Sequence, residues 1–494
     1  MSGATSPQRV LVTGATGYVG GRLVPELLRR GYRVRAAART VERLRTRPWA
    51  AHPNVELVAA DVLDLDSLRR ATAGAWAVYY LVHSMAPGTA EFSDTDRRGA
   101  QNMAQAAAGL RRLIYLGGLG EAAGDLSEHL RSRAEVADTL RAGSVPVTVL
   151  RAAMLIGSGS ASFEILRYLV DRLPLMITPR WLATISQPIA VSNAIAYLVG
   201  CLEHDETTGQ TYDIGGPELV TYRTLMETYA DEAGLHRPRI IAVPVLTPRL
   251  SSYWIQLVTP VPAALSRPLV EGLRNPMVCR DGRIRDLIPQ QLLTPREAIR
   301  RALEEWRGPA LDHSRIDAGH GAPAEWAVPG DPSWAGGRAY VDSRRVELEA
   351  SPEAVWDVVH RIGGDTGWYA VNWLWSLRGG LDRLLGGVGL RRGRPARRAL
   401  EAGDAVDFWR VAAIMPNERL VLEAEMRLPG RAWLEFQLRP LGRGGTELAQ
   451  TAWFLPRGWV GVLYWYAIAP FHAIVFGRML RGISRAATGP APLA

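Results

Sequence analysis

The stretch RVLVTGATGYVGG at residues 9–21 constrains the fold of this chain more than any other part of its sequence. A short apolar run leads into Gly14, Gly17 and Gly20, and an amphipathic segment with helical spacing follows. Strand, glycine turn and helix in this order place backbone N–H groups and a helix N-terminus around a pyrophosphate. The pattern therefore predicts a dinucleotide site built from Gly14, Thr16, Gly17, Tyr18, Val19 and Gly20.

The second apolar run, YRVRAAART at residues 32–40, has Arg39 near its end. An NAD site usually carries a carboxylate there, which accepts a hydrogen bond from the ribose 2′-hydroxyl. An arginine instead pairs with a 2′-phosphate, and Arg43 follows one turn later. We therefore predict that NADP(H) is preferred over NAD(H). The alternative is that Arg39 stacks on the adenine.

Apolar runs and helical segments continue to alternate through the first half of the chain. Strands are expected in residues 55–62, 76–85, 111–120 and 145–155, with helices between them. This rhythm predicts an α/β fold of the Rossmann type, a doubly wound parallel sheet covered on both faces. Cofactors bind at the carboxyl ends of such strands, which adds Asp61 and Val62 as adenine contacts and Val82, His83 and Ala152 as further cofactor-binding residues.

At this point the chain resembles the short-chain dehydrogenase/reductase superfamily. TGATGYVGG at residues 13–21 is similar to its extended or atypical branch, and residues 187–226 (QPIAVSNAIAYLVGCL to YRTLM) resemble that branch's C-terminal lobe. The resemblance covers roughly residues 8–305. It implies an NAD(P)-binding Rossmann domain with a C-terminal substrate lobe over residues 1–307, and oxidoreductase chemistry.

The superfamily's catalytic residues are replaced in this chain. The superfamily uses Tyr-x-x-x-Lys and a Ser or Thr at the end of the fifth strand, whereas the aligned positions here read His129-x-x-x-Arg133 and Gly117–Gly118. The sequence contains no lysine, so all 58 basic residues are arginine. The usual mechanism therefore cannot be carried over.

His129 and Arg133 are the catalytic candidates. An imidazolium with a pKa near 6.5 can donate a proton to a carbonyl near neutral pH. Arg133 would lower that pKa by like-charge repulsion and could hold the nicotinamide ribose. The alternative is an ordinary solvated helix face, and His83 and Ser84 are the next candidates.

Two apolar stretches indicate an apolar substrate. Residues 157–181 combine a flexible entry with an apolar helix, which suits either a substrate lid or plain core packing. Residues 244–276 are apolar and rich in proline, and we expect a hydrophobic wall there rather than a regular element. A carbonyl, enone or quinone-like compound is the predicted substrate class.

A linker and a second domain complete the chain. Residues 308–337 are rich in glycine and proline and are expected to be a linker; His313 and His320 within it are not predicted to bind metal, and no metal site is predicted elsewhere. Residues 338–494 show a strand, a helix start at Ser351–Pro352, alternating strands and a long C-terminal helix. This order resembles the START-like helix-grip fold, an α+β antiparallel sheet, and an uncharacterised domain fused to atypical reductases. A ligand pocket and a filled core both remain open.

One face of the antiparallel sheet is expected to be exposed to solvent. Residues 431–439 alternate, with Leu434 and Phe436 on the core side and Trp433 and Glu435 on the solvent side.

The charge pattern leaves several partners open. The net charge of +9 favours anionic partners, but without a nucleic-acid motif no nucleic acid is predicted. RRGRPARR at residues 391–398 is either a solvated loop or a contact for anionic lipid or phosphate. Two isolated cysteines and the lack of an apolar N-terminal region predict a cytoplasmic location. The oligomeric state is left open.

The C-terminal helix raises the question of a membrane. Residues 458–477 carry no formal charge, but Pro470 interrupts them. Arg478, Arg481 and Arg485 share one face, and Phe471, Val475 and Met479 are expected to line another. We expect an amphipathic helix that grips the sheet, with peripheral membrane contact as the alternative.

Three functions are consistent with this sequence. The first is an NADP(H)-dependent oxidoreductase acting on an apolar compound. The second is a non-catalytic NADPH-binding protein, either a redox sensor or an assembly factor, in which loss of the catalytic residues is expected. The third is a peripheral lipid-binding protein.

Overall fold

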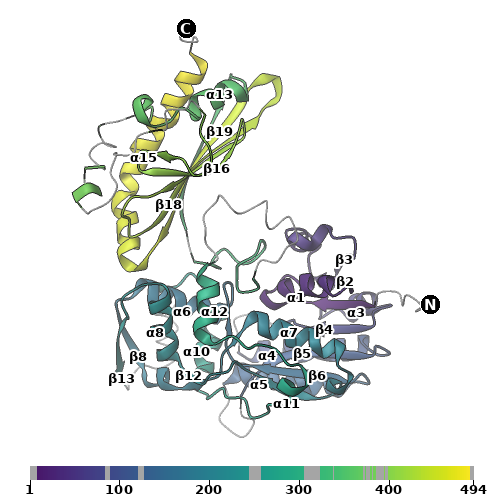
Figure 1. Cartoon of the computed structure of the whole chain (residues 1–494). Helices are drawn as coiled ribbons and strands as arrows, with labels where there is room; N and C mark the ends of the chain where they lie inside the picture. Colours follow the sequence, from purple (N-terminus) through teal and green to yellow (C-terminus); the bar gives the residue numbers. More distant parts are fainter. Residues whose placement is uncertain are drawn as a thin grey trace. The chain divides into compact units, whose positions relative to one another are not determined.

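The computed structural model describes residues 8–83, 89–120, 127–243, 258–304, 323–337, 339–370 and 399–489, together with 373, 379–380, 382–384 and 394. The chain forms two compact units (Figure 1). The first contains residues up to Glu305 and Gly321–Gly337, and the second contains Trp306–His320 and Arg338–Ala494.

A seven-stranded parallel sheet forms the centre of the first unit, as the sequence predicted. Its strand order is β11-β6-β5-β4-β1-β2-β3, and every pairing in it is parallel. The order reverses between β1 and β4, and the carboxyl ends of strands at such a point form the ligand crevice of this fold. The strands are β1 (Arg9–Thr13), β2 (Arg33–Ala38), β3 (Val55–Ala59), β4 (Ala77–Tyr80), β5 (Arg112–Gly118), β6 (Val147–Ala152) and β11 (Thr211–Ile214).

Helices cover both faces of this sheet. Apolar residues of α1 (Tyr18–Arg29) and α7 (Val191–Glu203) join the core on one face. Those of α3 (Leu65–Thr72), α4 (Thr89–Ala106) and α5 (Glu128–Arg141) join the core on the other. The short α2 (Val41–Arg45) follows β2. The first unit is therefore a doubly wound Rossmann fold.

A second core lies in the C-terminal part of the first unit. It is built mainly from α6 (Ala161–Arg172), α8 (Tyr222–Glu232), α10 (Ala263–Gly272) and α12 (Pro295–Glu304). The regular helix α10 differs from the wall without secondary structure that we expected, although residues 244–257 lie outside the described part. The remaining elements are β7 (Leu155–Ile156), β8 (Leu175–Pro179), β9 (Ile185–Ser186), β10 (Ile189–Ala190), β12 (Val220–Thr221), β13 (Arg239–Val243) and α11 (Arg283–Leu287).

The segment 323–337 packs on the first unit, which differs from the predicted linker. Its carbonyl groups and Asp331 accept hydrogen bonds from the buried Arg22, so the segment supplies partners that a buried guanidinium needs. Residues 308–322, which include His313 and His320, lie outside the described residues.

The second unit is a separate α+β domain with a six-stranded antiparallel sheet. The strand order is β14-β19-β18-β17-β16-β15, and the 31-residue helix α15 runs along the sheet (Figure 1). Ser351 caps α13 as predicted, since its Oγ accepts from the Ala354 N–H at 3.4 Å. The elements are β14 (Tyr340–Leu348), α13 (Pro352–Val359), β15 (Ala405–Val406), β16 (Trp409–Met415), β17 (Arg419–Ala424), β18 (Gly430–Pro440), β19 (Thr446–Pro456) and α15 (Gly458–Thr488).

The prediction that Trp433 and Glu435 face water was wrong. Trp433 is 1% exposed, and it pairs across the strands with Trp453. Glu435 forms an ion pair with Arg419 at 2.6 Å, and the guanidinium of Arg431 lies 4.8 Å from the Trp433 ring centroid. Cross-strand aromatic pairing and arginine stems thus cover the face that alternation alone assigned to solvent.

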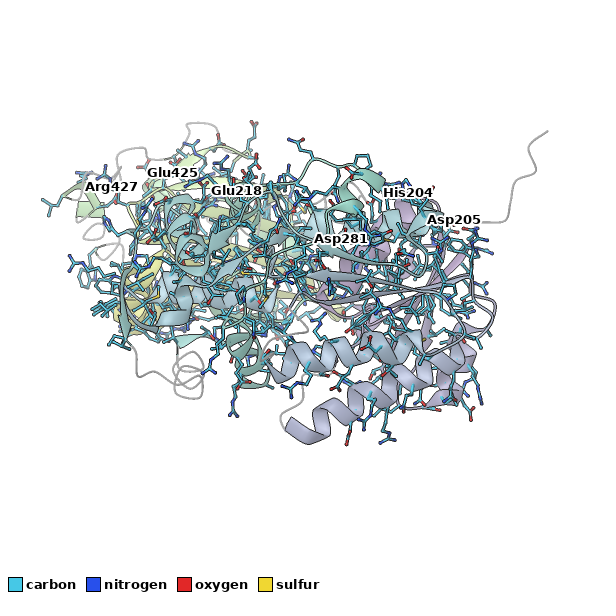
Figure 2. All side chains as sticks on the ribbon, turned by 90° about the horizontal axis from the view of Figure 1, so that it is seen from below. His204, Asp205, Glu218, Asp281, Glu425 and Arg427 are labelled. Atoms are coloured by element: carbon cyan, nitrogen blue, oxygen red, sulfur yellow. The ribbon has the colours of Figure 1, made fainter. Side chains whose placement is uncertain are left out.

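Arginines are distributed over both units and form many surface ion pairs. Three acidic residues labelled in Figure 2 illustrate this: Asp205 binds Arg111 at 2.8 Å, Asp281 binds Arg283 at 2.7 Å, and Glu425 binds Arg410 at 2.6 Å. Such exposed pairs contribute little to stability.

Candidate functional site: a cavity at the carboxyl ends of the strands

The glycine turn after β1 has the geometry that a dinucleotide requires. Gly14 has a φ of +69°, and a Cβ there would lie 2.7 Å from the carbonyl oxygen of Leu81. A Cβ at Gly20 would overlap the carbonyl oxygen of Gly14, so helix and turn pack backbone to backbone. Helix α1 begins after Gly17 with no side-chain cap and no acidic residue in its first turn. Its first N–H groups therefore suit an anion such as a pyrophosphate.

A cavity of about 1330 Å³ opens beside this turn. Single-ligand pockets usually measure about 300–1,000 Å³, so this one is large enough for a dinucleotide together with a second compound. It brings together twelve of the residues named from sequence: Gly14, Thr16, Gly17, Tyr18, Val19, Gly20, Arg39, Val82, His83, His129, Arg133 and Ala152.

Asp61 and Val62, predicted to contact adenine, do not line the cavity. Strand β3 ends at Ala59, so both residues lie in the turn beyond it. The Asp61 carboxylate accepts from the Leu63 N–H at 3.0 Å, and the Val62 carbonyl accepts from the Asn102 side chain at 2.9 Å. Asp61 thus orders the turn before α3, and Val62 joins that turn to α4. Ser84, the second-rank candidate beside His83, lies outside the described residues.

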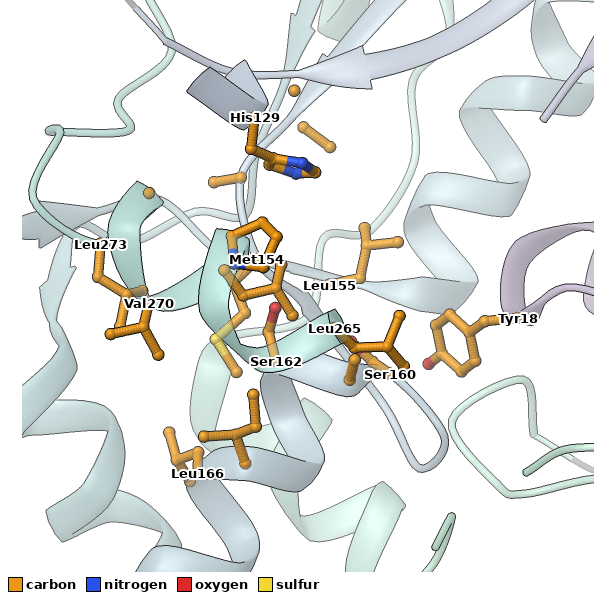
Figure 3. Close-up of a pocket in the computed structure, with 18 of the residues that line it drawn as sticks. Tyr18, His129, Met154, Leu155, Ser160, Ser162, Leu166, Leu265, Val270 and Leu273 are labelled. Carbon is orange, nitrogen blue, oxygen red and sulfur yellow. The ribbon is translucent and has the colours of Figure 1, made fainter. Parts of the chain in front are cut away.

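The rest of the cavity wall is mostly apolar. Helices α6 and α10 contribute Leu166, Leu265 and Val270, and Met154 follows β6. In Figure 3, His129 projects into the cavity from one side, Leu166 closes the opposite side, and Tyr18 lies at the end near the glycine turn. The expected lid helix and hydrophobic wall therefore both line this space.

His129 lies at the cavity end of a chain of buried polar groups. Its Nδ1 is 3.2 Å from Nε2 of His83, and Nδ1 of His83 is 2.9 Å from a carboxylate oxygen of Asp96 on α4. Ser132 donates to the same carboxylate at 3.3 Å. His129 is 6% exposed and Asp96 is 5% exposed, which excludes the solvated helix face that was the alternative.

Sequence reasoning missed Asp96. It lies 13 residues after His83 and 33 before His129, with no motif between them. The only available signal was an acidic residue on the helix after the fourth strand.

The sequence suggested that His129 acts as an imidazolium near neutral pH. The pKa of the buried ring contradicts this. Burial is the largest cause, and together with the charge of Arg133 it lowers this pKa to about 2. Burial also lowers the pKa of His83, against the hydrogen bond to Asp96. Both rings are therefore neutral at neutral pH. Arg133 lowers the pKa of His129, as expected, but the loss of hydration on burial lowers it more.

Two neutral rings allow either tautomer, so the charge of Asp96 sets the direction of the hydrogen bonds. An ionised Asp96 accepts from Nδ1–H of His83, whose Nε2 then carries a lone pair and accepts from Nδ1–H of His129. This leaves Nε2 of His129 as a hydrogen-bond acceptor, with no partner among the described residues. The chain can pass a proton between the cavity and Asp96 without forming an imidazolium beside Arg133.

Arg133 packs against the end of β5. Its Nη2 donates to the Leu116 carbonyl at 2.7 Å, while its buried Nε has no partner among the described residues. A Cβ at Gly118 would lie 2.9 Å from Leu130 and 3.3 Å from Arg133. Glycine at the end of β5 thus accommodates the arginine that follows His129 by one turn.

A buried aspartate secures the glycine turn from behind. Asp331 binds Arg22 at 2.8 Å and Arg47 at 2.9 Å, and all three side chains are at most 2% exposed. Arg47 also donates to the carbonyl of Thr16, at 2.5 Å. Segment 323–337 is therefore part of the support for the cavity, and its Trp334 lines the cavity directly.

No cluster of three or more metal-ligating side chains occurs among the described residues.

Comparisons with known proteins agree with this geometry. Residues 14–168 match the family described as NAD(P)H-binding. The first unit contains an NAD(P)-binding domain. Residues 334–479 match a family described as a protein of unknown function (DUF2867), which leaves the START-like resemblance as an expectation.

Three curated relatives cover parts of the chain. NADH dehydrogenase (ubiquinone) 1 alpha subcomplex subunit 9 of Arabidopsis thaliana is 26% identical over 44% of this chain and 56% of its own length. Cinnamoyl-CoA reductase 1 of Oryza sativa is 36% identical over 23% and 35%. Ceramide reductase of Caulobacter vibrioides is 27% identical over 48% and 73%. The chain thus spans about half or less of the first two relatives.

Two solved structures align with about 60% of this chain. Triphenylmethane reductase of Citrobacter, complexed with NADP(H), aligns with a TM-score of 0.48 and 19% identity over 60% of this chain and 99% of its own. A nucleoside-diphosphate-sugar epimerase of Staphylococcus aureus aligns with a TM-score of 0.49 and 15% identity over 59% and 100%.

Proposed function

We propose that this protein is an NADP(H)-dependent oxidoreductase acting on an apolar carbonyl, enone or quinone-like compound. The observation that supports this most strongly is that one cavity joins the glycine turn, the His129 ring and an apolar wall. The names of two relatives, ceramide reductase and cinnamoyl-CoA reductase, point to substrates with large apolar parts.

Two arginines support the choice of NADP(H). Arg39 and Arg43 both line the cavity and are exposed. Neither has an ion-pair partner among the described residues, so both remain available for a 2′-phosphate.

Arg39→Ala is expected to weaken NADPH binding about tenfold or more and to leave NADH binding nearly unchanged. A charge-assisted hydrogen bond contributes roughly 1.5–3 kcal/mol, and about 1.4 kcal/mol corresponds to tenfold in affinity. Calorimetric titration with both cofactors measures this. Arg45→Ala is the matched control, because Arg45 is an exposed arginine on the following helix α2 but does not line the cavity. Equal losses for NADPH and NADH would contradict the assignment.

The chain of hydrogen-bonded groups from His129 through His83 to Asp96 would transfer the proton of the reaction. When bound, the nicotinamide exchanges a hydride with the substrate carbon. In the oxidation of an alcohol, the hydroxyl proton passes to Nε2 of His129, Nδ1–H of His129 passes to His83, and Nδ1–H of His83 passes to Asp96. Carbonyl reduction runs the same transfers in reverse, starting from protonated Asp96. Arg133 would hold the nicotinamide ribose through its Nε–H.

A second candidate is a non-catalytic NADPH-binding protein, a redox sensor or assembly factor. Gly118 in place of the catalytic hydroxyl favours it, as does the similarity to a subunit of NADH dehydrogenase.

A substrate panel distinguishes the two candidates. NADPH consumption should be stimulated by long-chain or polycyclic carbonyls more than by short polar ones, because the cavity wall is apolar. NADPH binding without turnover on any member of the panel would favour the sensor. Absence of NADPH binding would overturn both.

A further inference from the structure

The first half of helix α15 carries an exposed apolar stripe. Six large side chains in it are 46–64% exposed, and their spacing of three or four residues places most of them on one side of the helix. Contiguous exposed apolar surface marks a contact site. The six residues, here called the α15 stripe, are Trp459, Val460, Leu463, Tyr466, Phe471 and Ile474.

Phe471 was expected on the packing face and is instead 59% exposed. The buried side of α15 is set by Trp465, and six residues further on the helix has turned by about 120° from it. Phe471 therefore belongs to the outward side.

The outward side becomes basic in the second half of the helix. Arg478, Arg481 and Arg485 are exposed and share one face, as the sequence predicted. The sequence contains no acidic residue after Glu447. The outward side of α15 thus joins an aromatic and aliphatic region to a positive one.

This combination has the chemistry of the lipid–water boundary. Tryptophan and tyrosine are enriched where hydrocarbon meets headgroups. Arginines near an anionic leaflet are attracted to its headgroups. An amphipathic helix with such faces lies in the plane of the interface.

The helix is held too firmly to cross a bilayer alone. Within the described residues, α15 is the one helix long and apolar enough to do so, with a mean hydropathy of 1.5 over a window that is 17% buried. However, a Cβ at Gly461 would overlap the carbonyl oxygen of Pro429, and one at Gly482 would overlap that of Tyr369. Trp465, Phe476 and Met479 are buried in the second unit. Spanning would remove these groups from the core of that unit.

We propose that the α15 stripe docks on the surface of an anionic lipid bilayer, with Arg478, Arg481 and Arg485 contacting the headgroups. This proposal does not depend on the proposed redox function.

Vesicle flotation of the full chain tests the proposal. The wild type should float with phosphatidylcholine vesicles containing phosphatidylglycerol and at least tenfold less with phosphatidylcholine alone. Leu463→Glu combined with Tyr466→Glu should reduce flotation at least tenfold, because two charges would enter the apolar region. Arg478→Glu combined with Arg481→Glu should remove the preference for anionic vesicles. Met415→Glu is the matched control, an exposed apolar residue on β16.

Two results would overturn the proposal. One is that the wild type floats with neither kind of vesicle. The other is that the stripe variants change the mass of the protein in solution while flotation stays the same, which would identify a second copy of the chain as the partner. Because NADPH binding reports only on the first unit, far-UV circular dichroism and thermal unfolding of each variant serve as the fold control, and both should be unchanged. Because both double variants alter exposed side chains only, loss of folding is not the expected cause of lost flotation.

Discussion

Replacing His129 with asparagine is expected to lower turnover by about 10²–10⁴-fold, the range for loss of a general acid–base group, while NADPH affinity is largely kept. Asparagine preserves a polar group but cannot exchange a proton between the cavity and His83. Single-turnover and steady-state rates, measured on whichever carbonyl is reduced fastest, check this.

Asp96→Asn and the control His236→Asn sharpen this test. Asp96 does not itself line the cavity, but the chain needs a carboxylate that can take up and release a proton, so Asp96→Asn should also slow turnover. His236 is exposed and does not line the cavity, and its replacement should have no effect. An unchanged rate in the His129 variant would remove His129 from the mechanism and would make His83 the next residue to test.

The pH profile should also differ from that of an ordinary histidine acid. Burial and Arg133 hold the pKa of His129 at about 2, so the ring stays neutral from mildly acidic to basic pH. The rate should therefore show no loss centred near pH 6.5 as the pH rises. A loss centred there would indicate that an imidazolium donates the proton, and would contradict the chain of neutral rings.

Asp331→Ala is expected to destabilise the first unit by about 3–5 kcal/mol, the usual cost of removing one partner of a buried ion pair. Two buried guanidinium groups, those of Arg22 and Arg47, would lose their carboxylate together. Hydrogen–deuterium exchange resolved by peptide is the measurement. Exchange should rise in β1, α1 and segment 323–337, and should stay unchanged in the second unit, which has its own core.

The matched control for Asp331 is Asp281→Ala. The N–O distance of the Asp281–Arg283 pair is similar to those of the Asp331 pairs, but the Arg283 side chain is 63% exposed. The change in stability and in exchange should therefore be small. NADPH binding should weaken in the Asp331 variant and not in the control, because Arg47 also holds the carbonyl of Thr16 in the glycine turn. Equal exchange in the two variants would show that segment 323–337 does not support the cavity.

The parallel sheet and its glycine turn could be predicted from sequence because their signals are local. Apolar runs bounded by glycine identified the strands, and β1 and β5 begin and end within two residues of the expected positions. The same local pattern placed Arg39 and Gly17 at the cavity, since the carboxyl ends of parallel strands meet at one edge. The strand end was misjudged at β3, which ends at Ala59, and Asp61 beyond it does not line the cavity.

Only the tertiary structure determined how distant residues meet. Asp96, His83 and His129 come from three separate elements, and no spacing along the chain encodes their contact. Segment 323–337 has the composition of a linker, but it packs because Arg22 and Arg47 need buried partners. Trp433 alternates like a surface residue, yet a cross-strand tryptophan and an arginine cover it. In each case a long-range contact decided the outcome, and local sequence patterns carry no information about which distant group will satisfy a buried charge or cover an aromatic ring.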